Sequence, residues 1–346
     1  MAMPTAEESR WRTERERLNR RRAELGEEAA RLYRGAHRVG STSLLCRPEW
    51  IPDVPLPLER VELVWEETPE PPVVTGAQAP LPPGYRAYSQ AMGALAAPAV
   101  FENRPVYRLL EADLAGRGGS GAVLRLSGAR YFDGVDVGEA VAHELAARVA
   151  GLPLRTLVGD PCDLARRTAV PAVTTVTIRR RARDVVLHRR DPAKVAHAGG
   201  LYQVMPVGVF QPVTEDPRED LDLWRCMARE FAEEFLGADE EYRPGFSYRE
   251  WPFYRRLEQA RAAGAVRVHC LGIGVDPLSL AVDVLTAAVI DDAAFGELFG
   301  GLVRVNAEGR VAMAPLEGPA PRPMQPAGAA ALELARRHRD LLLSRR

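Results

Sequence analysis

The chain has 346 residues, which exceeds one average domain, so two domains are expected. Its net charge of −1 and 46% hydrophobic residues are typical of a soluble globular protein and do not favour nucleic acid as a partner. The sequence contains no run of about 18 apolar residues and therefore predicts no membrane span. Lys194 is the only lysine, which argues against Schiff-base chemistry.

The four cysteines are scattered along the chain and form no C-x-x-C pair, which argues against both a zinc site and a disulfide framework. Residues 1–22 are charged throughout and have no apolar core, so they do not resemble a secretory signal. Reduced thiols and a charged N-terminus together predict a cytoplasmic protein.

Residues 5–34 interleave arginine and glutamate, and this pattern predicts a charged helix within the segment 1–38. Ion pairs spaced four residues apart explain the pattern better than contacts with phosphate do. We expect the helix to be solvated or to contact a second copy of the chain, so a homodimer is one interpretation.

The region 39–158 is predicted to be an α+β segment of unknown role. Residues 106–115 and 122–126 alternate between apolar and polar as strands do, and 136–150 predict a helix. A glycine-rich run at 117–121 separates the two strands. No helix follows the run directly, so we expect a hairpin loop there and not a phosphate-binding loop.

Two features of this region each have two interpretations. Glu139 and His143 are four residues apart on the predicted helix, so they either share a metal ion or form hydrogen bonds on one helix face. The segment 101–114 combines aromatic residues with arginines. That composition is equally typical of a substrate-binding surface and of an ordinary interface between domains.

The second half of the chain predicts a sheet followed by a long helix. Residues 172–190 contain two β-branched runs and predict a hairpin. A Gly-Gly turn at 199–200, another strand and a Pro-Val-Gly loop at 206–208 come next. An acidic helix with a 3-4-4 apolar stripe then follows; the stripe consists of Trp224, Met227, Phe231 and Phe235.

Three carboxylates lie along this helix, because Glu230, Glu233 and Glu234 are spaced at i, i+3 and i+4. They lie roughly 100° from the apolar stripe, so the helix carries them along the edge of a packed surface. Like charges this close repel, so they either point into water or hold a divalent cation. Carboxylate oxygens suit Mg²⁺ or Mn²⁺, and these cations in turn bind phosphate oxygens.

This order of elements and these residues resemble the Nudix hydrolase family, whose signature is G-x5-E-x7-R-E-U-x-E-E-x-G-U, where U is a bulky aliphatic residue. Residues 229–234 match the R-E-U-x-E-E core, with Phe231 in place of the aliphatic residue, and Gly208 matches the opening glycine. The resemblance implies an α/β fold, an α/β/α sandwich with a mixed sheet, over residues 166–318. A C-terminal helix is expected at 329–346.

The resemblance also implies the activity and the site. Glu230, Glu233 and Glu234 would be catalytic and would bind Mg²⁺ or Mn²⁺ together with the carbonyl of Gly208. The implied reaction is metal-dependent hydrolysis of a nucleoside diphosphate linked to another group, so the expected partner is a small nucleotide or diphosphate. Arg229 would be the structural arginine that pairs with the first glutamate of the signature.

The chain departs from the signature in two places. Gly208 and Arg229 are 21 positions apart instead of 14, so the intervening loop is longer, and Glu215 and Glu219 are the expected partners of Arg229. The terminal glycine, Gly237, comes one place late. These departures favour a second hypothesis, in which a Nudix-like module senses a nucleotide or metabolite without hydrolysing it. An isomerase or transferase on the same scaffold is a third.

Overall fold

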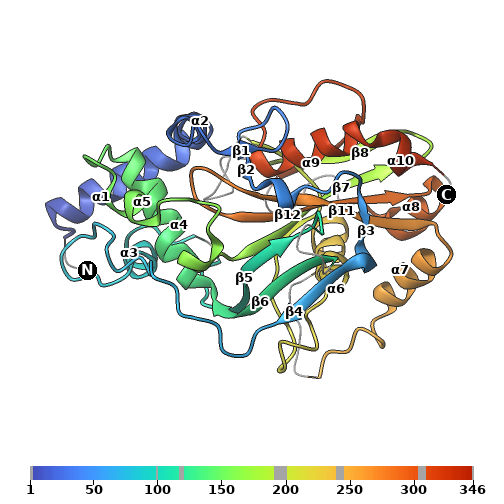
Figure 1. Cartoon of the computed structure of the whole chain (residues 1–346), viewed down its shortest axis with the longest axis horizontal. Helices are drawn as coiled ribbons and strands as arrows, with labels where there is room; N and C mark the ends of the chain where they lie inside the picture. The colour runs from blue at the N-terminus through green and yellow to red at the C-terminus, as the bar shows by residue number, and fades with distance from the viewer. Residues whose placement is uncertain are drawn as a thin grey trace.

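The computed structural model describes residues 3–98, 100–116, 121–190, 201–238, 245–302 and 309–344. Most of the predicted glycine-rich loop at 117–121 lies outside the described residues, as do Lys194 and the Gly-Gly turn at 199–200. Figure 1 shows a cluster of N-terminal helices at one end of the molecule, beside a large central sheet.

The charged N-terminal segment forms two helices and not one. α1 (Ala6–Arg20) begins with a capping box between Thr5 and Glu8, and α2 (Arg22–Leu32) follows after a break at Arg21. α1 buries Trp11, Arg15 and Leu18 and packs against α4 (Tyr131–Ala146) of the same chain. One face of the predicted solvated helix is therefore covered by the chain itself.

The main sheet has ten strands, seven of them in the order β1-β2-β11-β12-β7-β8-β13. Their bounds are β1 (His37–Arg38), β2 (Leu45–Cys46), β3 (Leu56–Pro57), β7 (Pro171–Arg179), β8 (Asp184–Arg190), β9 (Tyr202–Val204), β10 (Val207–Val209), β11 (Val266–Val275), β12 (Val282–Ile290) and β13 (Gly309–Pro315). β7 and β12 run parallel, and β8 returns antiparallel to β7 as the predicted hairpin. The chain is thus α/β with a mixed sheet, as the sequence predicts.

Helices cover both faces of this sheet. α9 (Pro326–Arg337) packs on β7, β9 and β12, whereas α6 (Leu223–Glu230) packs on β7 and β10 from the other side (Figure 1). Within the described residues, three further helices of this half of the chain are α7 (Pro252–Ala262), α8 (Asp292–Phe299) and α10 (Arg339–Leu343). The predicted C-terminal helix is therefore two helices, α9 and α10. Within the described residues, every helix is too short or too polar to span a bilayer.

A second, three-stranded sheet has the order β4-β6-β5, with β4 (Val61–Trp65), β5 (Pro105–Asp113) and β6 (Ala122–Arg130). It braces the chain that leads into α6. The amide of Tyr107 donates to the carbonyl of Phe210 over 3.2 Å, and the Tyr107 hydroxyl donates to the carbonyl of Pro217 over 2.6 Å. At Tyr107, the aromatic segment 101–114 therefore forms an interface within the chain.

The main sheet extends across the predicted domain boundaries. β2 and β3 belong to the region 39–158, yet both pair with β11, through Leu45 opposite Val275 and Leu56 opposite Cys270. One hydrophobic core runs from Trp11 in α1 to the C-terminal helices. Two further helices, α3 (Tyr88–Leu95) and α5 (Pro153–Val158), complete the N-terminal part.

Candidate functional site

The acidic helix begins at a well-defined cap. The Asp222 carboxylate accepts hydrogen bonds from the amides of Trp224 and Arg225 over 2.8 and 3.3 Å, so it satisfies amides that have no partner within the helix. Trp224 and Met227 are buried, as the predicted apolar stripe requires. This face holds α6 against β7 and β10 and leaves its orientation little freedom.

The helix changes its pitch in the middle of the Nudix-like core. α6 ends at Glu230, and Phe231–Phe235 form a π-helical turn, η4. The two phenylalanines of this turn pack edge to face with each other and against Phe299 of α8. A π turn contains more residues than an α-helical turn, so the three carboxylates are not spaced as they would be on a regular α-helix.

Gly208 and Glu230 meet as the resemblance implies. β10 lies so close to α6 that a Cβ on residue 208 would overlap the carboxyl group of Glu230. Any larger residue at this position would require the Glu230 side chain to move. Glu234 reaches the same strand, because the Val207 amide donates to its Oε2 over 3.2 Å. The structure thus brings together three of the four predicted site residues: Gly208, Glu230 and Glu234.

The three glutamates differ in burial. Glu233 and Glu234 are half-buried in η4, whereas Glu230 is buried at the end of α6. Burial raises the pKa of the Cys226 thiol, and the charges of Glu230 and Glu233 raise it further. Across the described ranges, no group of three histidine, cysteine, aspartate or glutamate side chains is arranged to hold a metal ion.

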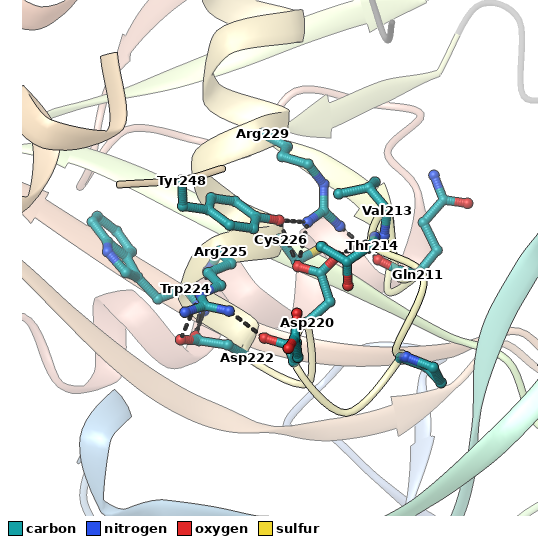
Figure 2. A network of polar contacts seen from close by, with 12 residues as sticks. Gln211, Val213, Thr214, Asp220, Asp222, Trp224, Arg225, Cys226, Arg229 and Tyr248 are labelled. Atoms are coloured by element: carbon teal, nitrogen blue, oxygen red, sulfur yellow. Dashed lines mark hydrogen bonds and ion pairs between the residues drawn. The ribbon is translucent and has the colours of Figure 1, made fainter. Parts of the chain in front are cut away.

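Arg229 is buried and holds the long loop before the helix. Its guanidinium donates to the carbonyl of Gln211 over 2.6 Å, lies 3.5 Å from Asp220 Oδ1, and also contacts the Tyr248 hydroxyl. Tyr248 in turn donates to Asp220 over 2.7 Å. Figure 2 shows these groups converging between α6 and the loop. We call Gln211, Asp220, Arg229 and Tyr248 the loop network.

Asp220 takes the place that the sequence analysis assigned to Glu215 or Glu219, so that expectation is wrong. Asp220 is fully buried, and its Oδ2 accepts the amides of Val213 and Thr214 over 2.6 and 3.0 Å. A shorter carboxylate suits this position because it must accept backbone amides and face Arg229 at the same time. Burial, and then the charge of Asp220, raise the pKa of Tyr248, whereas Arg229 opposes them.

Glu139 and His143 do not face a common metal. Glu139 pairs with Arg15 and Arg22, while His143 Nδ1 lies 3.0 Å from the Tyr88 hydroxyl and Trp11 stacks on its ring. Burial lowers the pKa of His143 to about 4, helped by Arg15 and opposed by Glu139. We call the set Arg15, Arg22, Tyr88, Glu139 and His143 the helix network, since it joins α1, α2, α3 and α4.

The sequence was compared with protein-family models and with curated proteins. No family model matches the chain, and no curated protein is similar to it in sequence. The resemblance to the Nudix family therefore rests on the residues around Gly208 and Arg229 and on their contacts.

Proposed function

We propose that this chain is a Nudix-like hydrolase that cleaves a nucleoside diphosphate linked to another group, with Mg²⁺ or Mn²⁺. One observation carries the proposal: the glycine and the first glutamate of the motif, 22 places apart in the sequence, are in contact across β10 and α6. A glycine in close contact with the carboxyl group of an acid is the arrangement that the motif implies for a cation site.

The oxygen donors at this place fit a hard divalent cation. The carboxylates of Glu230 and Glu234 and the carbonyl of Gly208 would hold it. When bound, the cation would neutralise charge on the phosphate oxygens and lower the pKa of a bound water. Glu233, on the half-buried side of η4, would accept a proton or complete the set after a change of rotamer.

The loop network has a positioning role in this proposal. Arg229, in the last turn of α6, and Asp220, just before this helix, connect residues 211–214 to the acidic helix through hydrogen bonds to the backbone. The loop starts two residues after β10, so its conformation sets where Gly208 lies relative to Glu230. The longer loop therefore keeps a fixed geometry in spite of its departure from the motif.

A specific observation favours the alternative function, a sensor that binds a nucleotide or metabolite without hydrolysing it. The π turn after Glu230 changes the angle between Glu233 and the two glutamates beside β10 from that of a regular α-helix. A set of two carboxylates would bind a cation and a diphosphate, yet it would lack the third acid that the hydrolase motif uses.

Turnover by the full chain distinguishes the two functions. Nucleotide sugars, dinucleotides and nucleoside triphosphates would be incubated with Mg²⁺ or Mn²⁺, and released phosphate compounds would be measured. We expect Glu230→Gln and Glu234→Gln to reduce turnover by at least about a hundredfold, because each removes a charge that stabilises the transition state. Glu297→Gln, at an exposed position on α8, is the matched control and should retain full activity.

Three results are informative. Metal-dependent turnover that falls in both site variants supports the hydrolase. A ligand that raises the melting temperature with Mg²⁺ but yields no product supports the sensor. Turnover that survives both substitutions and excess chelator would place the chemistry elsewhere in the chain.

A further inference from the structure

A large cleft lies on the face of β10 opposite Glu230 and Glu234. Its volume is about 1280 Å³, above the range of roughly 300–1,000 Å³ that is usual for small-molecule sites. Val207 and Val209 line it, whereas Gly208 between them faces Glu230. Because successive residues of a strand point to opposite faces, this cleft is separate from the acidic helix. Its walls come from α2, α4 and α9.

Most charged side chains around this cleft already have partners within the chain. Arg167 donates to the carbonyl of Leu280 over 2.8 Å, and Arg336 donates to the carbonyl of Gly318 over 2.6 Å. Arg22 is paired with Glu139. Among the acids, Asp276 accepts the amides of Leu278 and Ser279, and Glu333 accepts the amide of Ser41. These groups hold loops in place.

Asp283 differs from these groups. It is the second residue of β12, at the start of the mainly apolar segment 282–290, and it lines the cleft with only 8% of its surface exposed. Within the part of the chain that the structure describes, its one hydrogen bond comes from the hydroxyl of Thr174, over 2.7 Å to Oδ1. Among the described residues, its second oxygen contacts no arginine and no backbone amide within hydrogen-bond distance.

A buried carboxyl with so few partners destabilises its charged form. Burial raises the pKa of Asp283 to about 7, the nearby Asp276 raises it further, and the Thr174 hydroxyl opposes both. A leucine or valine would fill this strand position without that penalty. The position therefore suits a group that needs a partner from outside the chain.

We propose that this cleft binds a small organic cation, an amine or amidine on an apolar body, with its charged nitrogen at Asp283. The carboxyl group faces the cleft and supplies the anion, while Val207, Val209 and Leu280 supply apolar walls for the body of the ligand. A phosphate or carboxylate ligand is disfavoured because Asp283 is itself an acid. The arginines Arg167 and Arg336 donate to backbone carbonyls, and Arg22 pairs with Glu139. The inference is independent of the proposed hydrolase.

Benzylamine and benzyl alcohol test this directly, since they share ring and size but differ in charge. Isothermal titration of the full chain should show that benzylamine binds and that Asp283→Asn weakens this binding at least about tenfold, because a hydrogen bond to a charged group is lost. Benzyl alcohol should bind weakly and equally to both proteins. Glu27→Gln, at the exposed rim of the cleft, removes the same charge and should bind benzylamine like the wild type.

A second variant keeps the test decisive if Asp283→Asn does not fold. Val209→Trp fills the cleft from its floor without changing a charge, and it should also weaken the binding of benzylamine. Equal affinity of benzylamine and benzyl alcohol for the wild type would overturn the proposal. So would benzylamine binding that is unchanged in both variants, or no binding at several millimolar benzylamine. None of these measurements depends on hydrolysis.

Discussion

Arg229 and Arg15 are both buried and both contact a carboxylate, but the networks around them join different parts of the chain. The loop network connects side chains to the backbone, through the carbonyl of Gln211 and the amides that Asp220 accepts. The helix network connects side chains of four helices to one another. Arg229 therefore stabilises the conformation of a loop, whereas Arg15 stabilises the packing of helices against one another.

This difference also determines how each network responds to acid. The helix network includes His143, which must stay neutral where it is buried. The loop network contains no histidine. Acid should thus loosen the N-terminal helices at a pH where the loop beside the candidate site is still held.

The largest expected effect is that of Arg229→Met. It leaves the charge of Asp220 buried without its guanidinium partner, so we expect the free energy of unfolding to fall by about 3–5 kcal/mol. Urea unfolding measures this change. Arg256→Met, at an exposed position of α7, should alter stability by less than about 0.5 kcal/mol. Equal losses in the two variants would contradict a special role for the loop network.

The second prediction concerns acid stability. The folded-state pKa of His143, about 4, is below the unfolded value near 6.5, so the unfolded chain takes up the proton first. Stability is therefore full above pH 6.5 and is lost as the pH falls, by about 2 kcal/mol at pH 5. His143→Gln should remove this part of the pH dependence, while His37→Gln, at an exposed position, should not. The same dependence of stability on pH in the wild type and in both variants would refute this prediction.

The third prediction concerns Asp283, a buried carboxyl whose side chain is bonded by the Thr174 hydroxyl. Its folded-state pKa of about 7 exceeds the usual value of 3.8, so the unfolded chain releases the proton first and stability falls as the pH rises. Relative to the wild type, Asp283→Asn should gain about 1.4 kcal/mol between pH 6 and pH 8. Chemical denaturation at both pH values measures the gain. A constant difference would show that Asp283 does not titrate in this range.

The smallest expected effect separates the two networks most directly. Tyr248→Phe removes the hydroxyl between Arg229 and Asp220, which should lower stability by about 1 kcal/mol. Hydrogen exchange at the amides of Val213 and Thr214 should also become faster. Tyr88→Phe removes a comparable hydroxyl from the helix network and should leave those two amides unchanged. Faster exchange in both variants would mean that the networks are coupled.

Periodicity and residue type were sufficient to predict the hairpin of β7 and β8. The contact between Gly208 and Glu230 was implied by the resemblance to the Nudix family and not by periodicity. Periodicity did not predict that β2 and β3 join the main sheet, because strands of two residues carry no detectable alternation. Asp220 was not predicted as the partner of Arg229, because the acid of the motif was sought at the standard distance from Gly208 and the loop is longer here. Asp283 could have been noticed as an acid within a mainly apolar segment. Both faces of β12 are buried, however, so the apolar pattern of the sequence does not show which face Asp283 occupies.

The π turn after Glu230 separates the spacing of the acids in the sequence from their spacing in space. A π turn is an α-helix that has gained one residue per turn, and here it carries the two phenylalanines that contact Phe299. Glu233 and Glu234 follow Glu230 at the places of the motif, and the extra place before Gly237 comes only afterwards, at 235–236. The same letters on a regular α-helix would therefore present the acids at different angles, so a motif that matches in sequence does not by itself fix the shape of its helix.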